Sequence, residues 1–202
     1  RLMRDRIVVG GVETDLDDAG VEAIRSMLDE VGQLFPALVQ LYDNTASLQD
    51  RTVATGRLDP ALARRFGAGG FVGRASGRVF DARRTLPYPP YDDLSFEVPL
   101  RDDGDVNARV WIRIHEVEQC LRLIRQLLDG MPEGPIHVEP EKPSGPVEGM
   151  ALVEGFRGDI LIWLRLDGDG HVGRCHLRDP SWFQWPLLEA VIEDNIVADF
   201  PL

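Results

Sequence analysis

Apolar residues recur at helical spacing in two neighbouring stretches near the start of the chain, residues 17–28 and 31–48. In the second stretch, Leu34, Leu38 and Leu41 follow one another at intervals of four and three residues, which places them on one face of a helix. The pattern therefore predicts two successive helices.

A short helix is predicted after Asp59, because Asp59 is a favourable N-cap, Pro60 fits the first helical position and the helix can end at a glycine. The glycine-rich run that follows, Gly67–Gly73, has neither the GxxxxGK[ST] nor the GxGxxG pattern of phosphate-binding loops. This run predicts a flexible turn that allows neighbouring segments to pack closely.

Residues 106–128 form the strongest helical pattern in the chain. Apolar residues alternate there at spacings of four and three: Val110, Ile114, Val117, Leu121, Ile124 and Leu128. Further apolar residues widen this stripe, which predicts burial over much of the helix surface. Gly130 and Pro132 end the helix.

Prolines shape the segments on either side of this helix. The four prolines within residues 84–99 exclude a regular helix and predict extended chain, with Phe96 and Val98 on one side of a short strand. Residues 132–149 are rich in Pro, Gly and Glu, and they predict a long flexible loop.

The last part of the chain predicts a β-hairpin and a final helix. Ile160–Leu164 reads as a strand, Asp167–Gly170 as a turn and His171–Arg178 as the returning strand, and a helix begins near Pro186. We therefore expect one α+β domain over residues 1–202. Helices should dominate it, with one long buried helix and a small antiparallel β-hairpin packed on that helix near the C-terminus.

Composition narrows the classes of function. The net charge of −12 argues against binding nucleic acid or anionic lipid through clustered Lys and Arg, and it suits docking on a basic partner. No run approaches the roughly 20 apolar residues of a membrane-spanning helix.

Cys120 and Cys175 form no CxxC pair, so we expect two separate buried thiols in a reducing cytoplasm. Because the chain opens on Arg, we expect it to be a piece of a longer protein.

The histidines and the DGDG run predict no metal site. His171 and His176 are five residues apart on a strand, so they lie on opposite faces. Counted from Asp167, the twelfth position of a calcium loop is Arg178, where a bidentate Glu is required. The sequence has no Ser-His-Asp set, no HExxH and no paired-cysteine zinc pattern either.

Two blocks of the sequence resemble one protein family. Their runs are RASG (Arg74–Gly77), Pro87–Tyr88, YDDL (Tyr91–Leu94), FEVP (Phe96–Pro99), GDVNAR (Gly104–Arg109) and VEGFRGDI (Val153–Ile160). In order and spacing they resemble the large subunit shared by membrane-bound nickel–iron hydrogenases of the formate hydrogenlyase type and the quinone-pocket subunit of respiratory complex I. The resemblance implies the C-terminal portion of a hydrogenase-type large subunit coupled to electron transfer. The alternatives are an NADH–quinone oxidoreductase subunit and a redox-inactive scaffold.

The resemblance also implies a catalytic role for Arg157, supported by Glu154 and Gly158. In hydrogenase relatives, the Arg of a run like EAPRG projects its guanidinium over the open position between the two metals, whereas complex I relatives often have Lys there. Phe156 stands where the family has Pro. The alternative is that Arg157 pairs with Glu154 or Asp159 and shapes the entry to the hairpin.

Charged residues concentrate in the upstream block. They form a candidate ion network or proton path that comprises Arg74, Asp81, Arg83, Asp92, Asp105 and Arg109. The alternative is that these groups pin an irregular segment by hydrogen bonding, as buried polar groups must. Asn107 stands where relatives often have Tyr.

The resemblance finally implies cofactors and partners. The nickel ligands of the family are thiolates from two CxxC pairs, and neither pair occurs in this sequence. We therefore expect this chain alone to bind no metal and to be inactive, with a nickel–iron centre, or alternatively a quinone, in the parent protein. The implied partners are an iron–sulfur small subunit and membrane subunits, with no nucleic acid. They would hold the chain, itself not inserted, on the cytoplasmic face of the cell membrane.

Overall fold

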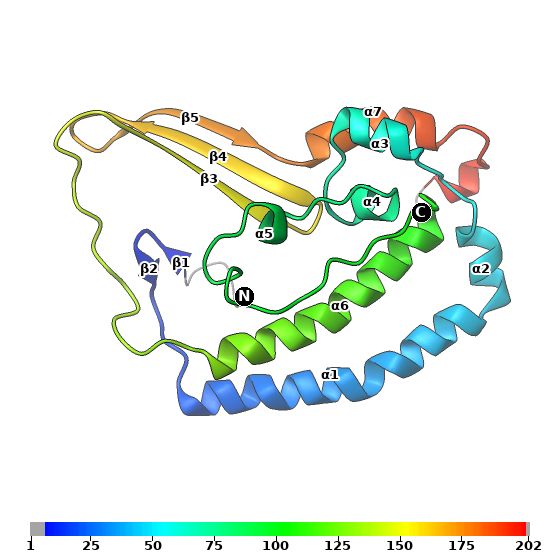
Figure 1. Ribbon diagram of the computed structural model, residues 1–202, viewed down its shortest axis with the longest axis horizontal. Coiled ribbons are helices and arrows are strands. Elements are labelled where there is room, and N and C mark those ends of the chain that lie inside the picture. The colour runs from blue at the N-terminus through cyan, green and yellow to red at the C-terminus, as the bar shows by residue number, and fades with distance from the viewer. Residues whose placement is uncertain (1–6, 201–202) are drawn as a thin grey trace.

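Helices outweigh strands in the structure, a computed structural model that describes residues 7–200 and is mixed α+β, as predicted. The longest helix, α1 (Asp18–Asn44), lies beside α6 (Val106–Asp129), and most of the shorter helices gather at one end of this pair (Figure 1). These shorter elements are α2 (Ala46–Thr52), α3 (Pro60–Phe66), α4 (Gly70–Ala75), α5 (Ala82–Thr85), α7 (Ser181–Val191) and the 3-10 helix η1 (Val197–Asp199).

Two antiparallel sheets complete the fold. A small sheet pairs β1 (Ile7–Val8) with β2 (Gly11–Val12). The larger sheet has the order β3-β4-β5 and consists of β3 (Val147–Gly155), β4 (Gly158–Leu166) and β5 (Val172–Arg178). Gly155 is opposite Gly158 in the β3–β4 register, so Phe156 and Arg157 form the tight turn between these strands.

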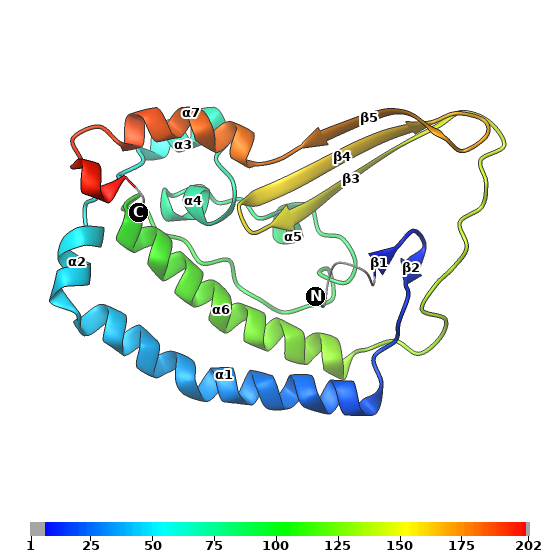
Figure 2. The same cartoon turned by 180° about the vertical axis from the view of Figure 1, so that it is seen from behind.

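The larger sheet differs from the predicted hairpin in two ways. The predicted hairpin corresponds to β4 and β5, and the loop predicted over residues 132–149 ends earlier than expected, because β3 begins at Val147. The sheet also does not lie along α6. Its β3–β4 turn meets α4 and α5, and the rest extends away from the helices (Figures 1 and 2). Most of β5 is consequently exposed.

The two helices predicted over residues 17–48 are in fact one helix up to Asn44, with Pro36 inside it, followed by α2. Proline costs a helix one backbone hydrogen bond, but residues on both sides of Pro36 are fixed by tertiary contacts. Leu28 is buried, and the Tyr42 hydroxyl donates to the Asn107 side chain of α6 at 2.9 Å. The break comes at Thr45, where the backbone is extended.

Other boundaries also shift. The final helix begins at Ser181 rather than near Pro186, and Phe96 is buried although residues 94–101 form no regular strand. The helix predicted after Asp59 is confirmed as α3. The Asp59 carboxylate accepts hydrogen bonds from two backbone N–H groups of its first turn, and Gly67 ends it with a φ of 66°.

The core lies where the short helices meet α6. One apolar cluster joins Leu58 and Ala63 to Leu187 of α7, and a second joins Ala75 of α4 to Ala108 and Ile112 of α6. The expectation of a long buried helix is only partly met, because α6 is buried mainly in its first half.

Two further observations concern membrane-spanning helices and the cysteines. Among residues 7–200, no helix combines the length and the apolarity that a membrane span requires. Cys120 and Cys175 are free and exposed, not buried as expected, because each lies on a solvent-facing side of its helix or strand.

Candidate functional site

A buried cluster of charged side chains surrounds Arg74 of α4. The Arg74 side chain is only 2% exposed, and its guanidinium lies among three carboxylates. It donates to Glu116 of α6 through Nε at 2.9 Å and also through Nη2, and to Glu154 of β3 through Nη1 at 2.9 Å. Asp81 lies 3.4 Å from Nη1. Arg74 thus connects three elements that are far apart in the sequence.

Asp81 extends this cluster to Arg83. The Asp81 carboxylate is the N-cap of α5 and accepts two hydrogen bonds from the Arg83 guanidinium, at 2.9 and 2.6 Å. Burial by itself would raise the pKa of Asp81, but the hydrogen bonds and the charge of Arg83, together with Arg74, hold that pKa below its usual value. Asp81 is therefore ionised across the neutral range.

Glu154 completes the cluster at the sheet. Its carboxylate accepts from Arg74 and from the backbone N–H of Ala82 at 2.9 Å, while its own N–H donates to the Tyr88 hydroxyl at 3.2 Å. Glu154 therefore fixes the end of β3 to α4 and α5. Two guanidinium groups face three carboxylates in the cluster, whose members are Arg74, Asp81, Arg83, Glu116 and Glu154.

Arg157 lies in the two-residue turn just beyond Glu154, and backbone packing holds that turn. Gly70 has a φ of +59°, and a Cβ placed on it would lie 2.5 Å from the Gly158 nitrogen. The Arg157 carbonyl accepts a hydrogen bond from the Gln184 side chain of α7 at 2.7 Å. The glycines allow this close approach, as expected for the run Gly67–Gly73, although α4 rather than a loop occupies its second half.

The Arg157 side chain itself is free of the two predicted alternative partners. It is 56% exposed, and the acidic group nearest to it in the structure is Asp179, 3.7 Å away and 42% exposed. Glu154 is engaged by Arg74, and Asp159 is engaged by Arg178 of β5. The alternative in which Arg157 pairs with Glu154 or Asp159 is therefore wrong.

Phe156, the residue that replaces the family's Pro, also contributes to holding the turn. Its ring packs on Phe71 of α4 with centroids 5.0 Å apart, and the Arg113 guanidinium of α6 lies over both rings. Offset aromatic packing and a cation over the ring face are both stabilising. Phe156 therefore helps to hold the turn against α4 and α6.

The remaining candidates lie elsewhere. Asp92 is exposed. Asp105 is the N-cap of α6 and accepts from the backbone of Ala54 and Ala108, both at 2.7 Å. Arg109 donates to the carbonyls of Gly56 and Gly104, both at 2.9 Å. The predicted network is thus divided: Arg74, Asp81 and Arg83 come together, whereas Asp92, Asp105 and Arg109 do not join them.

Arg109 contributes instead to an apolar cavity of about 450 Å³ between α6, α7 and η1. Most of its lining is aliphatic or aromatic, including Leu58, Val106, Leu187, Leu188, Val191 and Ile192. Burial lowers the pKa of Arg109, and Asp105 opposes that shift. Both hydrogen bonds of the Arg109 guanidinium to these carbonyls come from Nη1.

Sequence reasoning missed Glu116, Gln184 and Asp179. A signal for Glu116 was present, because it is four residues after Ile112 and seven before Leu123, so a carboxylate lies on the buried face of α6. Gln184 and Asp179 carry no such signal, since their roles depend on how α7 meets the β3–β4 turn.

Potential metal ligands gather at one place in the described part of the chain. Within residues 7–200, Asp167, Asp169 and His171 are the His, Cys, Asp or Glu side chains that lie closely enough for a common ion, and all three are exposed. Neither cysteine belongs to such a group. The described residues therefore do not by themselves fit a nickel–iron centre, which needs thiolate ligands.

Comparison with known proteins shows to which family the chain belongs. The family model for the 49 kDa subunit of respiratory-chain NADH dehydrogenase matches residues 1–148. The chain belongs to this family. The matched residues include Arg74, Asp81, Arg83 and Glu116, whereas Glu154 and Arg157 lie beyond residue 148.

Individual relatives extend the similarity to the whole chain. It is 34% identical to the carbon monoxide-induced hydrogenase of Rhodospirillum rubrum, over 97% of this chain and 55% of the relative. It is also 34% identical to an NADH-quinone oxidoreductase subunit of Syntrophobacter fumaroxidans (94% and 52%). Identity to formate hydrogenlyase subunit 5 of Escherichia coli is 32% (96% and 34%). The chain thus spans about half the length of the first two relatives.

A solved structure is similar as well. A chain of the membrane-bound sulfane sulfur reductase, an archaeal respiratory membrane complex, superimposes with a TM-score of 0.89 at 31% identity, over 97% of this chain and 55% of that one. These similarities confirm the predicted family resemblance.

Proposed function

We propose that this chain forms part of the large subunit of a membrane-associated, hydrogenase-type oxidoreductase and that Arg157 supplies a fixed positive donor at its reaction site. The observation that carries the proposal is the contrast within one turn. The Arg157 backbone is held by Gly70, Gly158 and Gln184, whereas its side chain is 56% exposed. A guanidinium whose backbone is held in place and whose side chain is accessible can stabilise negative charge that develops on a substrate.

Metal binding is not assigned to these residues. The described part of the chain does not fit a nickel–iron centre, so the proposal gives this chain the guanidinium and no metal ligand. We expect elemental analysis of the purified chain to find no stoichiometric nickel, iron or zinc. About one tightly bound transition metal per chain would contradict this expectation.

The test replaces Arg157 in the assembled complex. Arg157→Lys keeps the charge but shortens the reach and removes the planar fork, so hydrogen turnover should fall. Losing one preorganised donor typically costs on the order of 10²–10³ in rate. Arg165→Lys is the matched control, because Arg165 is 57% exposed on β4 and its nearest carboxylate, in Glu148, is 3.9 Å away. Unchanged turnover in Arg157→Lys would remove Arg157 from the mechanism.

A second candidate function is quinone reduction, and the apolar cavity beside Arg109 favours it. A volume of about 450 Å³ suits a small apolar ring, and pockets for such ligands are mostly apolar with a few polar donors. The two functions separate in one experiment. Leu188→Trp would fill the cavity and raise the KM for a short-chain quinone, but it should leave hydrogen turnover unchanged.

For the buried cluster around Arg74 we propose a structural role rather than a proton path. Each of its carboxylates already accepts from a guanidinium. A proton carrier works best with a pKa near the operating pH, and the pKa of Asp81 is instead lowered. The cluster then serves to fix the irregular segment and the base of the Arg157 turn.

The proposed partners follow from the multi-subunit complexes of the relatives. We propose an iron–sulfur subunit and membrane subunits that hold this chain on the cytoplasmic face of a membrane. Affinity capture of a tagged chain from native membranes, with mass spectrometry and iron analysis, should recover an iron–sulfur protein. Recovery of unrelated proteins alone would contradict this assignment.

A further inference from the structure

The backbone of Arg157 is held in place, but the backbone alone does not fix the guanidinium. Several rotatable bonds separate the Arg157 Cα atom from the guanidinium, and the side chain is 56% exposed. An exposed arginine can adopt many rotamers, and confining it to one of them costs free energy. A donor with a fixed direction therefore needs a second contact near the end of its side chain.

Asp179 provides a contact of this kind. Its Oδ2 atom lies 3.7 Å from Nη2 of Arg157. Among the described residues, Arg157 has the one cationic side chain that lies within ion-pair distance of Asp179. The separation is longer than a hydrogen bond, so the two charges attract each other while the N–H groups of the guanidinium remain available to a ligand.

The Asp179 carboxylate is itself held in one orientation. Its Oδ1 atom accepts hydrogen bonds from the Ser181 hydroxyl and from the Ser181 backbone N–H, the latter at 2.9 Å. These hydrogen bonds, together with the charge of Arg157, hold the pKa of Asp179 below its usual value. The carboxylate is therefore ionised at neutral pH, with one oxygen held by the start of α7 and the other near Arg157.

The residues before and after Asp179 set its place beside the turn. Arg178, the last residue of β5, forms an ion pair with Asp159 near the start of β4. Gln184 of α7 donates to the Arg157 carbonyl at 2.7 Å. The chain passes directly from β5 into α7 beside the β3–β4 turn (Figures 1 and 2). Arg157 is thus contacted at both ends, at its backbone by Gln184 and at its guanidinium by Asp179.

We propose that Asp179 is a positioning residue that orients the Arg157 guanidinium towards the reaction site. This inference rests on the function proposed above for Arg157, and it adds the residue that sets the direction of the donor. The two other carboxylates close to the turn do not fill this role, because Glu154 is engaged by Arg74 and Asp159 by Arg178. Asp179 acts through Arg157 and not by contact with a substrate.

The first test measures hydrogen turnover in the assembled complex. Asp179→Asn keeps the size of the side chain and an oxygen that accepts from Ser181, but it removes the charge that attracts Arg157. The kcat should fall by about three- to tenfold, because a misdirected donor stabilises the transition state less well.

Asp167→Asn is the matched control for this variant. Asp167 is 51% exposed and also accepts from backbone N–H groups, but it follows β4 at the opposite end from Arg157. The same chemical change at this position should leave kcat unchanged. An equal loss of kcat in both variants would overturn the inference.

A double-mutant cycle separates this inference from the proposed function. If Asp179 acts through Arg157, Asp179→Asn should cause no further loss once Arg157→Gln is present. If Arg157→Gln lowers turnover but Asp179→Asn does not, or if the two losses multiply, the inference is overturned and the proposed function stands. Unchanged turnover in Arg157→Gln would overturn both.

Nitrogen relaxation of the arginine side chains in the purified chain gives a readout that is independent of turnover. The Nε–H signal of Arg157 is identified by its loss in Arg157→Gln. Its order parameter should fall in Asp179→Asn, because the guanidinium loses the contact that restricts it, and it should stay unchanged in Asp167→Asn. An order parameter that is the same in Asp179→Asn and in the wild type would overturn the inference.

Discussion

Two arginines that lie close together in the fold differ in almost every physical respect. Arg74 is 2% exposed and is surrounded by three carboxylates, whereas Arg157 is 56% exposed and has one acidic group, Asp179, at 3.7 Å. A guanidinium surrounded by carboxylates is committed to holding the fold. One held only by its backbone is available to a substrate. Glu154 connects the two, because it pairs with Arg74 and precedes the Arg157 turn.

The largest effect is expected when the buried arginine is removed. Arg74→Met keeps much of the volume but leaves Glu116, Glu154 and Asp81 without a shared cation in a buried place. Breaking a buried ion pair from one side typically costs about 3–5 kcal/mol. Urea unfolding at neutral pH should show a loss in that range, and a loss below about 1 kcal/mol would contradict the structural role of the cluster.

The next effect concerns the glycine under the turn. Gly70→Ala places a Cβ 2.5 Å from the Gly158 nitrogen, in a backbone with a φ of +59°. The left-handed backbone costs about 1–2 kcal/mol and overpacking typically adds about 1–3 kcal/mol. Gly67→Ala is the matched control, because Gly67 has a φ of +66° but open space around its Cβ. Thermal unfolding should show a clearly larger loss for Gly70→Ala than for Gly67→Ala.

A smaller effect depends on pH. The pKa of Asp81 is lowered in the folded chain, so its ionised form stabilises the fold at pH values above the ordinary Asp pKa of about 3.9. This contribution disappears as the pH falls through the lowered value. Asp81→Asn should therefore be less stable than the wild type at pH 7, and the difference should shrink towards pH 3 in urea titrations. A difference that is independent of pH would show that the charge of Asp81 is unimportant.

The smallest effect should come from the exposed arginine. Arg157→Gln removes a weak ion pair at the surface, and such changes usually stay within about 0.5 kcal/mol. Its free energy of unfolding should match that of the wild type even where turnover falls. A loss comparable to that of Arg74→Met would mean that Arg157 also holds the fold.

The sequence predicted most where local rules decide the outcome. The N-cap at Asp59 and the glycine at 67 set the limits of α3, and the alternating apolar residues of 106–128 predicted α6. Local rules failed at Pro36, where packing on α6 keeps α1 continuous, and at Val147, where strand pairing with Leu166 extends into a segment rich in proline and glycine.

The candidate site was predictable only in part. Arg74, Asp81 and Arg83 were named from charge in one block of sequence, but Glu116 and Glu154 reach Arg74 across 42 and 80 residues. No spacing rule connects residues so far apart. Asp105 and Arg109 belong to the same block of sequence, but they lie at the start of α6, where Asp105 caps the helix and Arg109 donates to the carbonyls of Gly56 and Gly104.

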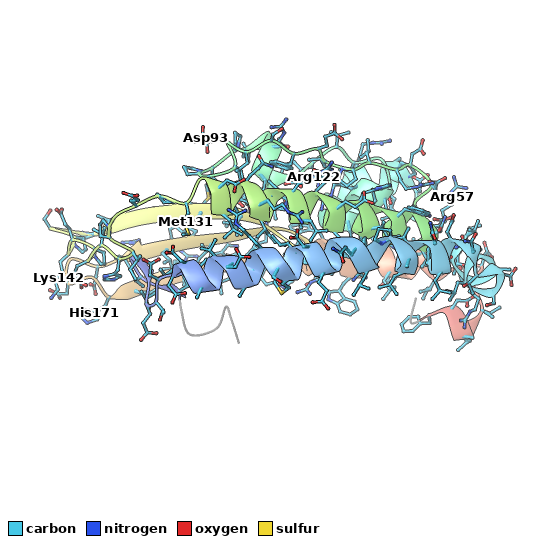
Figure 3. The ribbon with its side chains drawn as sticks, turned by 90° about the horizontal axis from the view of Figure 1, so that it is seen from below. Arg57, Asp93, Arg122, Met131, Lys142 and His171 are labelled. Carbon is cyan, nitrogen blue, oxygen red and sulfur yellow. The ribbon has the colours of Figure 1, made fainter. Side chains whose placement is uncertain are left out.

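The connection between α6 and β3 is fastened near its middle. The backbone of Ile136 and Val138 hydrogen-bonds to Val12 and Gly10, so the small β1–β2 hairpin holds this long segment in place. Lys142, the single lysine of the sequence, lies between these hydrogen bonds and β3 and is exposed (Figure 3). An amine-reactive dye would therefore label the side chains of the chain at one point only, in the segment between Val138 and β3. The rotational freedom of the dye would report the mobility of the segment between Val138 and β3. Mobility of the segment between α6 and Ile136 would not affect it.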